Sequence, residues 1–290
     1  MTAIDVPESL LWWKSVPGGA AWLDRLPRLA AECAEQWELE LGRPFKGSNV
    51  SLVLPTRAAV LKINFPDAES EHEPEALRIW DGNGAVRLLA DDPERRALLV
   101  ERCEPGTPLL ELDDDAAGDV VAGLLPRLWR PPTDELRLLA DVAVRWMDEI
   151  PELWETYGRP FERRILDAAV DALRELGPTQ GPLVVANEDL HAGNVLASRR
   201  EPWLVIDPKP LAAEREFTPV AMIRDRKEDV LAGPRPLGRL RRRLDRFSAG
   251  LGLDRERVRS WTVAHTIAWA FDPSEFHAAH AEVARLLLRA

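Results

Sequence analysis

Apolar positions in the first part of the chain change from a helical to a strand-like spacing. Over residues 8–40 they recur every three or four positions, and the VPGG stretch at 16–19 divides them into two predicted helices. Residues 48–65, SNVSLVLPTRAAVLKINF, are rich in Val, Leu and Ile and are interrupted by PTR, which predicts a β-hairpin. Residues 45–104 as a whole predict the order strand, strand, helix, strand, strand, with the helix ending at Gly82.

The second half of the chain has a mainly helical pattern. The stretch CEPGTPLLELDDD marks the change, and residues 114–176 carry apolar groups at helical spacing. Two short apolar runs, PLVVA at 182–186 and WLVID at 203–207, predict strands. We therefore predict an α+β protein with two lobes. The N-terminal lobe, residues 1–102, is small and has an antiparallel sheet, and the C-terminal lobe, residues 103–290, is larger and mainly helical.

The composition is that of a globular protein that binds neither membranes nor nucleic acid. Apolar residues make up 46% of the 290 positions and charged residues 30%, and no apolar run approaches the ~20 residues of a membrane helix. The formal net charge of −11 disfavours nucleic acid and favours a cationic partner. The arginines of residues 235–246 recur at helical spacing, which is typical of a solvated helix face.

The cysteines and the N-terminus indicate the compartment. Cys33 and Cys103 lie far apart and show no metal-ligand spacing, which favours a reducing environment. The N-terminal stretch has no basic start before an apolar run, so we expect no signal peptide. These features predict a cytoplasmic protein, and they leave a monomer and a homodimer both open.

Three polar residues around the two late strands suit phosphoryl transfer. Asp189 and Asn194 share the loop DLHAGNVL, and Asp207 ends the strand WLVID. Asn and Asp side chains are hard oxygen ligands for Mg²⁺, and a remaining Asp can accept the proton of an attacking hydroxyl. The spacing of Asp, four residues and Asn also matches a kinase catalytic loop. The alternative is an ordinary capped turn, in which Asp and Asn are common.

A second set of residues in the N-terminal lobe suits a nucleotide. Lys62 lies inside the apolar strand AAVLKINF, where a Lys is costly unless it is paired, and Glu73 on the next helix is the partner that we expect. Gly47, Ser48 and Asn49 form a turn, predicted to lie between strands, that could hold phosphates with backbone amides. A Lys that reaches solvent from an edge strand and a plain hairpin turn are the alternatives.

These motifs together resemble the aminoglycoside and hydroxyurea phosphotransferase family, in its streptomycin 6-kinase branch. The matching stretches are VLKINFPDAESEHEPEALRIWDGNGAVRLLADD, ALLVERCEPGTPL, DLHAGNVL and WLVIDPKPLAAEREF, and the resemblance covers nearly the whole chain. It implies a bilobal, protein-kinase-like fold and O-phosphorylation that depends on ATP and Mg²⁺. By this resemblance Asp189 is the catalytic base, and Asn194 and Asp207 hold the magnesium ion.

The resemblance also assigns the nucleotide contacts. Lys62 with Glu73 would set the phosphates, and backbone groups between Glu101 and Cys103 would face the adenine. The chain departs from the family where His usually precedes the catalytic Asp by two residues, because Asn187 stands there. It also has the run DPKPLAAEREF where the family tends to have glycines after the DPK element.

The function predicted is that of a small-molecule kinase. The acceptor implied is an aminoglycoside such as streptomycin, phosphorylated at its 6-hydroxyl and thereby inactivated. Hydroxyurea or another small metabolite is an alternative acceptor, and a nucleotide-binding pseudokinase that acts as a regulator is an alternative of another class. A protein kinase is less favoured, since no long activation segment follows Asp207.

Overall fold

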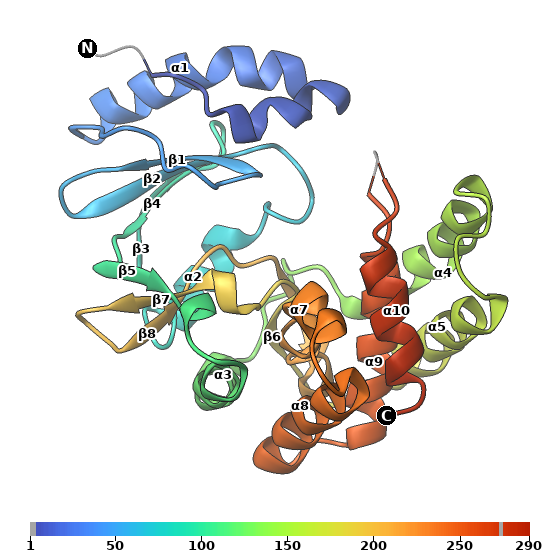
Figure 1. The fold of residues 1–290 in the computed structure, drawn as a ribbon. Coiled ribbons are helices and arrows are strands. Elements are labelled where there is room, and N and C mark those ends of the chain that lie inside the picture. Colours follow the sequence, from blue (N-terminus) through green and yellow to red (C-terminus); the bar gives the residue numbers. More distant parts are fainter. Residues whose placement is uncertain (1–3, 273–274) are drawn as a thin grey trace. The chain divides into compact units, whose positions relative to one another are not determined.

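The chain folds into two compact units (Figure 1). The computed structural model describes residues 4–272 and 275–290. The first unit comprises Met1–Gly106 together with Ala197–Leu204, and the second comprises Thr107–Leu196 together with Val205–Ala290. A short segment late in the sequence therefore belongs to the first unit.

An antiparallel sheet forms the centre of the first unit. Its order is β1-β2-β4-β3, and its strands are β1 (Ser51–Pro55), β2 (Ala59–Asn64), β3 (Leu88–Asp92) and β4 (Ala97–Glu101). The PTR interruption is the β1–β2 turn, where the Thr56 amide and hydroxyl both donate to the Ala59 carbonyl. This turn fixes the register in which Val53 lies opposite Lys62.

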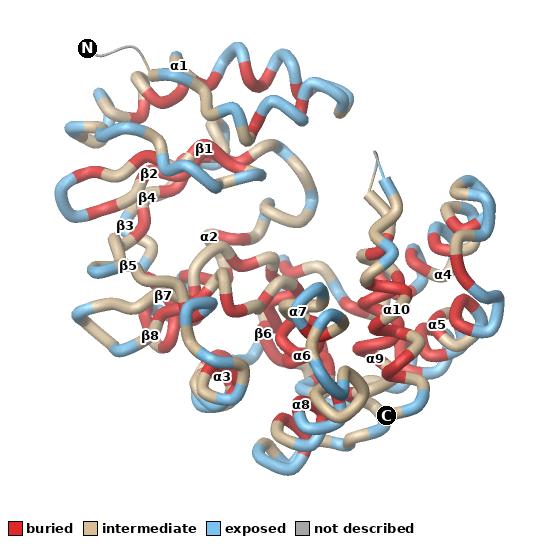
Figure 2. Tube along the Cα trace, in the orientation of Figure 1, coloured by how far each residue is buried: buried red, intermediate tan, exposed pale blue. Residues whose placement is uncertain are grey.

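Two helical segments cover one face of this sheet (Figures 1 and 2). They are η1 (Glu8–Ser15) and α1 (Gly19–Gln36), and their buried residues share one apolar core with the sheet. Trp13 stacks on Phe65 with ring centroids 4.0 Å apart. The turn between the helices requires glycine, because a Cβ at Gly19 would lie 1.9 Å from the Trp13 carbonyl oxygen.

Side-chain alternation places the next helix, α2 (Glu73–Trp80), on the other face of the sheet. Leu61 and Ile63 of β2 belong to the core under η1 and α1. Lys62 and Asn64 alternate with them and contact Glu73 of α2.

A further three-stranded sheet has the order β5-β7-β8, with β5 (Pro105–Pro108), β7 (Val195–Ser198) and β8 (Trp203–Val205).

The second unit is mainly helical. Its principal helices are α3 (Asp114–Leu128), α4 (Leu139–Thr156), α5 (Arg163–Leu176), α6 (Val220–Arg224), α7 (Lys227–Ala232), α8 (Pro236–Leu251), α9 (Arg255–Ala268) and α10 (Ala278–Leu287). Helix α9 is central, since it packs against α5, α6 and α10. None of the helices in the described part of the chain combines the length and the apolar character needed to cross a membrane.

A two-stranded antiparallel sheet in the second unit positions the polar loop. Strand β6 (Leu183–Asn187) pairs with β9 (Pro210–Glu214), and the last residue of β6 lies opposite the first residue of β9. Because the strands are antiparallel, the segment after Asn187 and the segment before Pro210 emerge at the same end. Asp189 and Asp207 lie in these two segments.

Candidate active site

A buried ion pair connects β2 and α2 in the first unit. The Lys62 Nζ lies 2.5 Å from Glu73 Oε2, and the two side chains are 8% and 2% exposed. Asn64 Nδ2 donates to the same carboxylate oxygen at 2.8 Å, and Ser51 Oγ in turn donates to Asn64 Oδ1 at 2.7 Å. The pair predicted from sequence is therefore present, and Asn64 is a further member that the period-two alternation from Lys62 could have indicated.

The predicted phosphate loop is an exposed turn at the start of β1. Gly47 has φ 116°, a backbone conformation that residues with a Cβ adopt only with strain. Ser48 Oγ donates to the Ser51 carbonyl at 2.6 Å and closes the turn. Asn49 follows with its side chain exposed. The turn has only the one glycine of the glycine-rich loops that cover phosphates in kinases.

The predicted adenine-binding segment is held by Arg200, which lies between β7 and β8. Arg200 Nε donates to Glu101 Oε1 at 2.8 Å, and its terminal nitrogens donate to the Gly82 and Ala85 carbonyls at 2.7 and 2.9 Å. Burial is the largest single influence and raises the pKa of Glu101, but the hydrogen bonds from Arg200 and from the Arg87 amide, together with the charges of these two arginines, bring the pKa below its usual value. Sequence analysis did not single out Arg200.

Cys103 lies two residues after Glu101 in the same segment. Burial raises the pKa of the Cys103 thiol to about 11, so that the thiol is protonated at neutral pH. The Glu101 amide donates to the Arg87 carbonyl at 2.9 Å. The Cys103 amide donates no hydrogen bond to any described residue.

Asn187 organises the polar loop of the second unit. Its Oδ1 accepts hydrogen bonds from the amides of Asp189 and Lys209, both at 3.0 Å, and its side chain is buried. The Glu188 amide adds a bond to the Lys209 carbonyl at 2.9 Å. One carboxamide thus joins the segment after β6 to the segment before β9. This is the structural role of Asn187.

Asn194 and Asp207 are joined through neighbouring backbone groups. Asn194 Nδ2 donates to the Asp189 carbonyl at 3.0 Å, and the amide of Ile206 donates to the Asn194 carbonyl at 2.9 Å. Asp207 is the next residue and has φ 51°, in the left-handed region that costs energy for a residue with a side chain. The structure thus brings Asp189, Asn194 and Asp207 into one local arrangement.

Asp225, at the end of α6, supports the same loop from a distant part of the sequence. Its Oδ2 accepts from the Ala192 amide at 3.0 Å, and its Oδ1 accepts from the Arg226 amide at 2.8 Å. The bond from Ala192 has no local sequence signal, because Ala192 lies far from Asp225 along the chain.

Arg224 contributes a buried cation beside Asp189. Its Nη2 lies 3.7 Å from Asp189 Oδ1, and its Nε donates to His265 Nδ1 at 3.2 Å. The guanidinium also lies over the Trp269 ring, 4.6 Å from the centroid. Burial lowers the pKa of Arg224 from its usual value, while Asp189 opposes this effect. Because arginine stays protonated in proteins, Asp189 faces a fixed positive charge.

Two buried histidines border this arginine. His280 Nε2 lies 3.4 Å from Arg224 Nη1, and the His265 ring stacks on Trp269. Burial, followed by the charge of Arg224, lowers the pKa of His280 to about 2 and that of His265 well below 6.5. Both imidazoles are consequently neutral near neutral pH.

The fold and these two sets of residues define a small-molecule phosphotransferase of the kinase-like type. Residues 38–273 match the family described as aminoglycoside/hydroxyurea antibiotic resistance kinase. The chain belongs to this family, and the resemblance drawn from its motifs is confirmed.

Curated relatives and solved structures agree with this assignment. The chain is 39% identical to a streptomycin 6-kinase of Streptomyces glaucescens, over 84% of this chain and 81% of the relative. It is 38% identical to a hydroxyurea phosphotransferase of Kitasatospora aureofaciens, over 97% and 84%. The choline kinase LicA of Streptococcus pneumoniae has the same fold, with a TM-score of 0.63 at 12% identity over 92% of this chain and 100% of that chain. The predicted α+β, kinase-like fold is thereby confirmed.

Proposed function

We propose that this protein transfers the γ-phosphoryl group of ATP to the 6-hydroxyl of streptomycin or of a close aminoglycoside. The observation that carries the proposal is the identity of 39% to a streptomycin 6-kinase, which extends over most of both chains. The arrangement of Asp189, Asn194 and Asp207 around the β6–β9 end supplies the chemistry that such a transfer needs.

The nucleotide would be bound mainly by the first unit. The Lys62 ammonium, held by Glu73, is suited to the α- and β-phosphates, and the Gly47–Asn49 turn to the outer phosphates. Backbone groups of the Glu101–Cys103 segment would meet the adenine. The choline kinase with this fold has also been solved in complex with AMP. We propose the division at residue 102, so that residues 1–102 bind nucleotide and residues 103–290 carry catalysis and acceptor binding.

Asn194 and Asp207 fit a magnesium site. The Nδ2 of Asn194 is engaged by the Asp189 carbonyl, and this leaves the amide oxygen, which is the atom that a hard cation prefers. The Asp207 carboxylate would provide a second oxygen ligand with negative charge. When bound, magnesium would neutralise charge on the outer phosphates. We expect Asp207→Ala to weaken nucleotide affinity in the presence of magnesium. Equal nucleotide affinities of Asp207→Ala and the unmodified protein under these conditions would contradict this assignment.

Asp189 would act as the base. Its backbone is held by Asn187, and its carboxylate lies beside Arg224, so its position is defined before the acceptor binds. The acceptor hydroxyl would donate its hydrogen bond to Asp189, which orients the oxygen toward the γ-phosphorus and takes the proton as the O–P bond forms. ADP leaves as the bond from the γ-phosphorus to its bridging oxygen breaks.

The acceptor that we propose is cationic, since aminoglycosides carry several ammonium groups and the chain has a net charge of −11. We also propose that the protein works in the cytoplasm, as a monomer or a homodimer. Hydroxyurea is the second candidate acceptor, because a hydroxyurea phosphotransferase is 38% identical over 97% of this chain.

A panel of acceptors with radiolabelled ATP tests the proposal. Streptomycin, an aminoglycoside of another class, hydroxyurea and a no-acceptor control are incubated separately with the full chain and magnesium. The proposal predicts label on streptomycin, with product identified as a monophosphate by mass spectrometry. Labelling of hydroxyurea alone would replace the proposed acceptor, and the absence of label on every acceptor would contradict a kinase function.

A further inference from the structure

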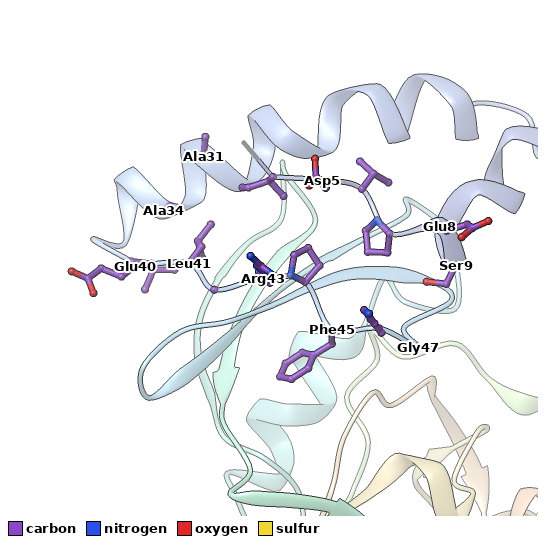
Figure 3. Close-up of a pocket in the computed structure, with 17 residues that line it drawn as sticks. Asp5, Glu8, Ser9, Ala31, Ala34, Glu40, Leu41, Arg43, Phe45 and Gly47 are labelled. Atoms are coloured by element: carbon purple, nitrogen blue, oxygen red, sulfur yellow. The ribbon is translucent and has the colours of Figure 1, made fainter. Parts of the chain in front are cut away.

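Helix η1 contacts the Gly47–Asn49 turn, the proposed phosphate loop, although the two are far apart in the sequence. Ser9 Oγ donates to the Ser48 carbonyl at 2.7 Å, and Trp12 Nε1 donates to the Asn49 carbonyl at 2.7 Å. Ser9 and Gly47 line one pocket, and Figure 3 shows Ser9 of η1 beside the segment that carries Phe45 and Gly47. Two successive carbonyls of the loop are therefore fixed by side chains of one helix.

These two bonds determine where the loop amides point. A trans peptide is planar, so the N–H of one residue points opposite to the C=O of the residue before it. With the Ser48 and Asn49 carbonyls bonded to η1, the amides of Asn49 and Val50 are directed away from η1. Neither amide donates a hydrogen bond to any residue that the structure describes. Successive free amides of this kind form a binding site for anionic oxygens.

Helix η1 is itself anchored firmly. Leu10 and Trp13 are buried in the core that η1 shares with α1 and the sheet, at 0% and 6% exposure. Ser9 and Trp12 alternate with them along the helix, and Trp12 remains 43% exposed. One side of the helix is thus anchored in the core and the other contacts the loop. This arrangement allows the helix to hold the loop in a fixed position.

We propose that η1 is a positioning element for ATP: Ser9 and Trp12 hold the loop so that the Asn49 and Val50 amides bind the β- and γ-phosphates. This inference rests on the proposed function, because it assumes that the Gly47–Asn49 turn receives phosphates. The two side chains do not touch the nucleotide. They act on nucleotide affinity through the orientation of two peptide groups.

The test compares the affinities of variants for ATP, ADP and adenosine by calorimetry on the full chain. Ser9→Ala and Trp12→Phe each remove one donor, and Trp12→Phe keeps an aromatic ring. Loss of one such hydrogen bond should weaken ATP binding about threefold to tenfold. Adenosine, which has no phosphate, should bind each variant as tightly as the unmodified protein. Ser9→Thr keeps a hydroxyl and should retain the affinity for ATP.

Ser15→Ala provides the matched control on the same helix. Ser15 Oγ donates to the Trp12 carbonyl within η1 and does not reach the loop. Its removal should leave the affinities for all three ligands unchanged. A general loss of structure in Ser9→Ala or Trp12→Phe would weaken adenosine and ATP equally, and this result would overturn the inference.

The outcome also separates this inference from the proposed function. If the unmodified protein phosphorylates an acceptor and the Ser9→Ala/Trp12→Phe double variant binds ATP with unchanged affinity, only the role of η1 is refuted. If the unmodified protein binds no ATP at all, the proposed function and the role of η1 both fail. Selective weakening of ATP and ADP supports the inference.

Discussion

The Lys62 ammonium and the Glu73 carboxylate form an ion pair that is almost entirely buried, with 2.5 Å between Nζ and Oε2. Buried ion pairs contribute little net stability, because desolvation of the two charges offsets their attraction. Asn64 donates to the same carboxylate oxygen and fixes its orientation. The arrangement therefore points to a requirement for a positioned cation at this place, which the proposed binding of phosphates would explain.

Glu73→Gln should leave the Lys62 charge buried without its carboxylate. We expect a loss of about 3 kcal/mol in the free energy of unfolding and a fall in kcat/KM of about a hundredfold. The double variant Lys62→Met/Glu73→Gln should regain most of the stability, since no charge is left unpaired, and its kcat/KM should be no higher than that of Glu73→Gln. Urea unfolding and steady-state kinetics measure both quantities. A double variant with near-normal kcat/KM would contradict the role of Lys62.

Asn187→Ala should disturb the catalytic loop. It removes the oxygen that accepts from the Asp189 and Lys209 amides, and unsatisfied buried amides cost about 1–3 kcal/mol. We expect a lower free energy of unfolding and a lower kcat, because Asp189 is no longer held. Asn187→Asp is the control, since it keeps an acceptor oxygen and similar volume, and it should retain more turnover. Equal turnover in the unmodified protein and Asn187→Ala would argue against this role.

Arg200→Lys tests the segment that is proposed to meet adenine. The substitution keeps the positive charge but loses the planar group that binds Glu101 and two carbonyls together. We expect the KM for ATP to rise about fivefold. Arg199→Lys is a matched control, because Arg199 is 83% exposed and makes one ion pair with Glu104. If both variants raise KM equally, the effect does not come from the Glu101 contact.

Stability should fall as the pH drops below about 6.5. In the folded protein the pKa of His280 is about 2 and that of His265 is well below 6.5, whereas both are near 6.5 in the unfolded chain. Between these values the unfolded state binds more protons, so acid favours unfolding and stability is fully present only above about pH 6.5. Each histidine should cost roughly 2 kcal/mol between pH 7 and pH 5.

Substitution of one histidine isolates its share of this effect. The decrease in the free energy of unfolding from pH 7 to pH 5 should be smaller by roughly 2 kcal/mol in His280→Gln than in the unmodified protein. Chemical unfolding at a series of pH values gives both decreases. Parallel pH profiles for the two proteins would show that His280 is not kept neutral by the fold.

The sequence was sufficient to predict interactions that have a local pattern. A Lys in an apolar strand followed by an acidic helix indicated Lys62 and Glu73, and a stretch rich in Val, Leu and Ile that is interrupted by PTR indicated the hairpin of β1 and β2. The kinase-like fold was implied by the family resemblance that these motifs carry, and it is confirmed by structures that share it. Strand β9 was missed, because PLAAE carries no turn or alternation signal and is buried throughout.

Interactions that depend on distant parts of the chain could not be predicted. Asn187 was recognised as an unusual residue, but its two bonds require the β6–β9 pairing to be known. Arg224 approaches Asp189 only because α6 packs beside α9 and its His265. The contact of Trp12 with the Asn49 carbonyl depends in the same way on how η1 packs on the sheet. Tertiary packing brings these groups together, and no spacing in the sequence records it.

The most direct test of the account is the rate of phosphate transfer from labelled ATP to streptomycin by the unmodified protein and by Asp189→Asn. The substitution keeps the size of the side chain and removes its ability to accept a proton. We predict a rate at least about a hundredfold lower in Asp189→Asn, with ATP affinity nearly unchanged. A variant that phosphorylates streptomycin at the unmodified rate would contradict the assignment of Asp189 as the base of a streptomycin kinase.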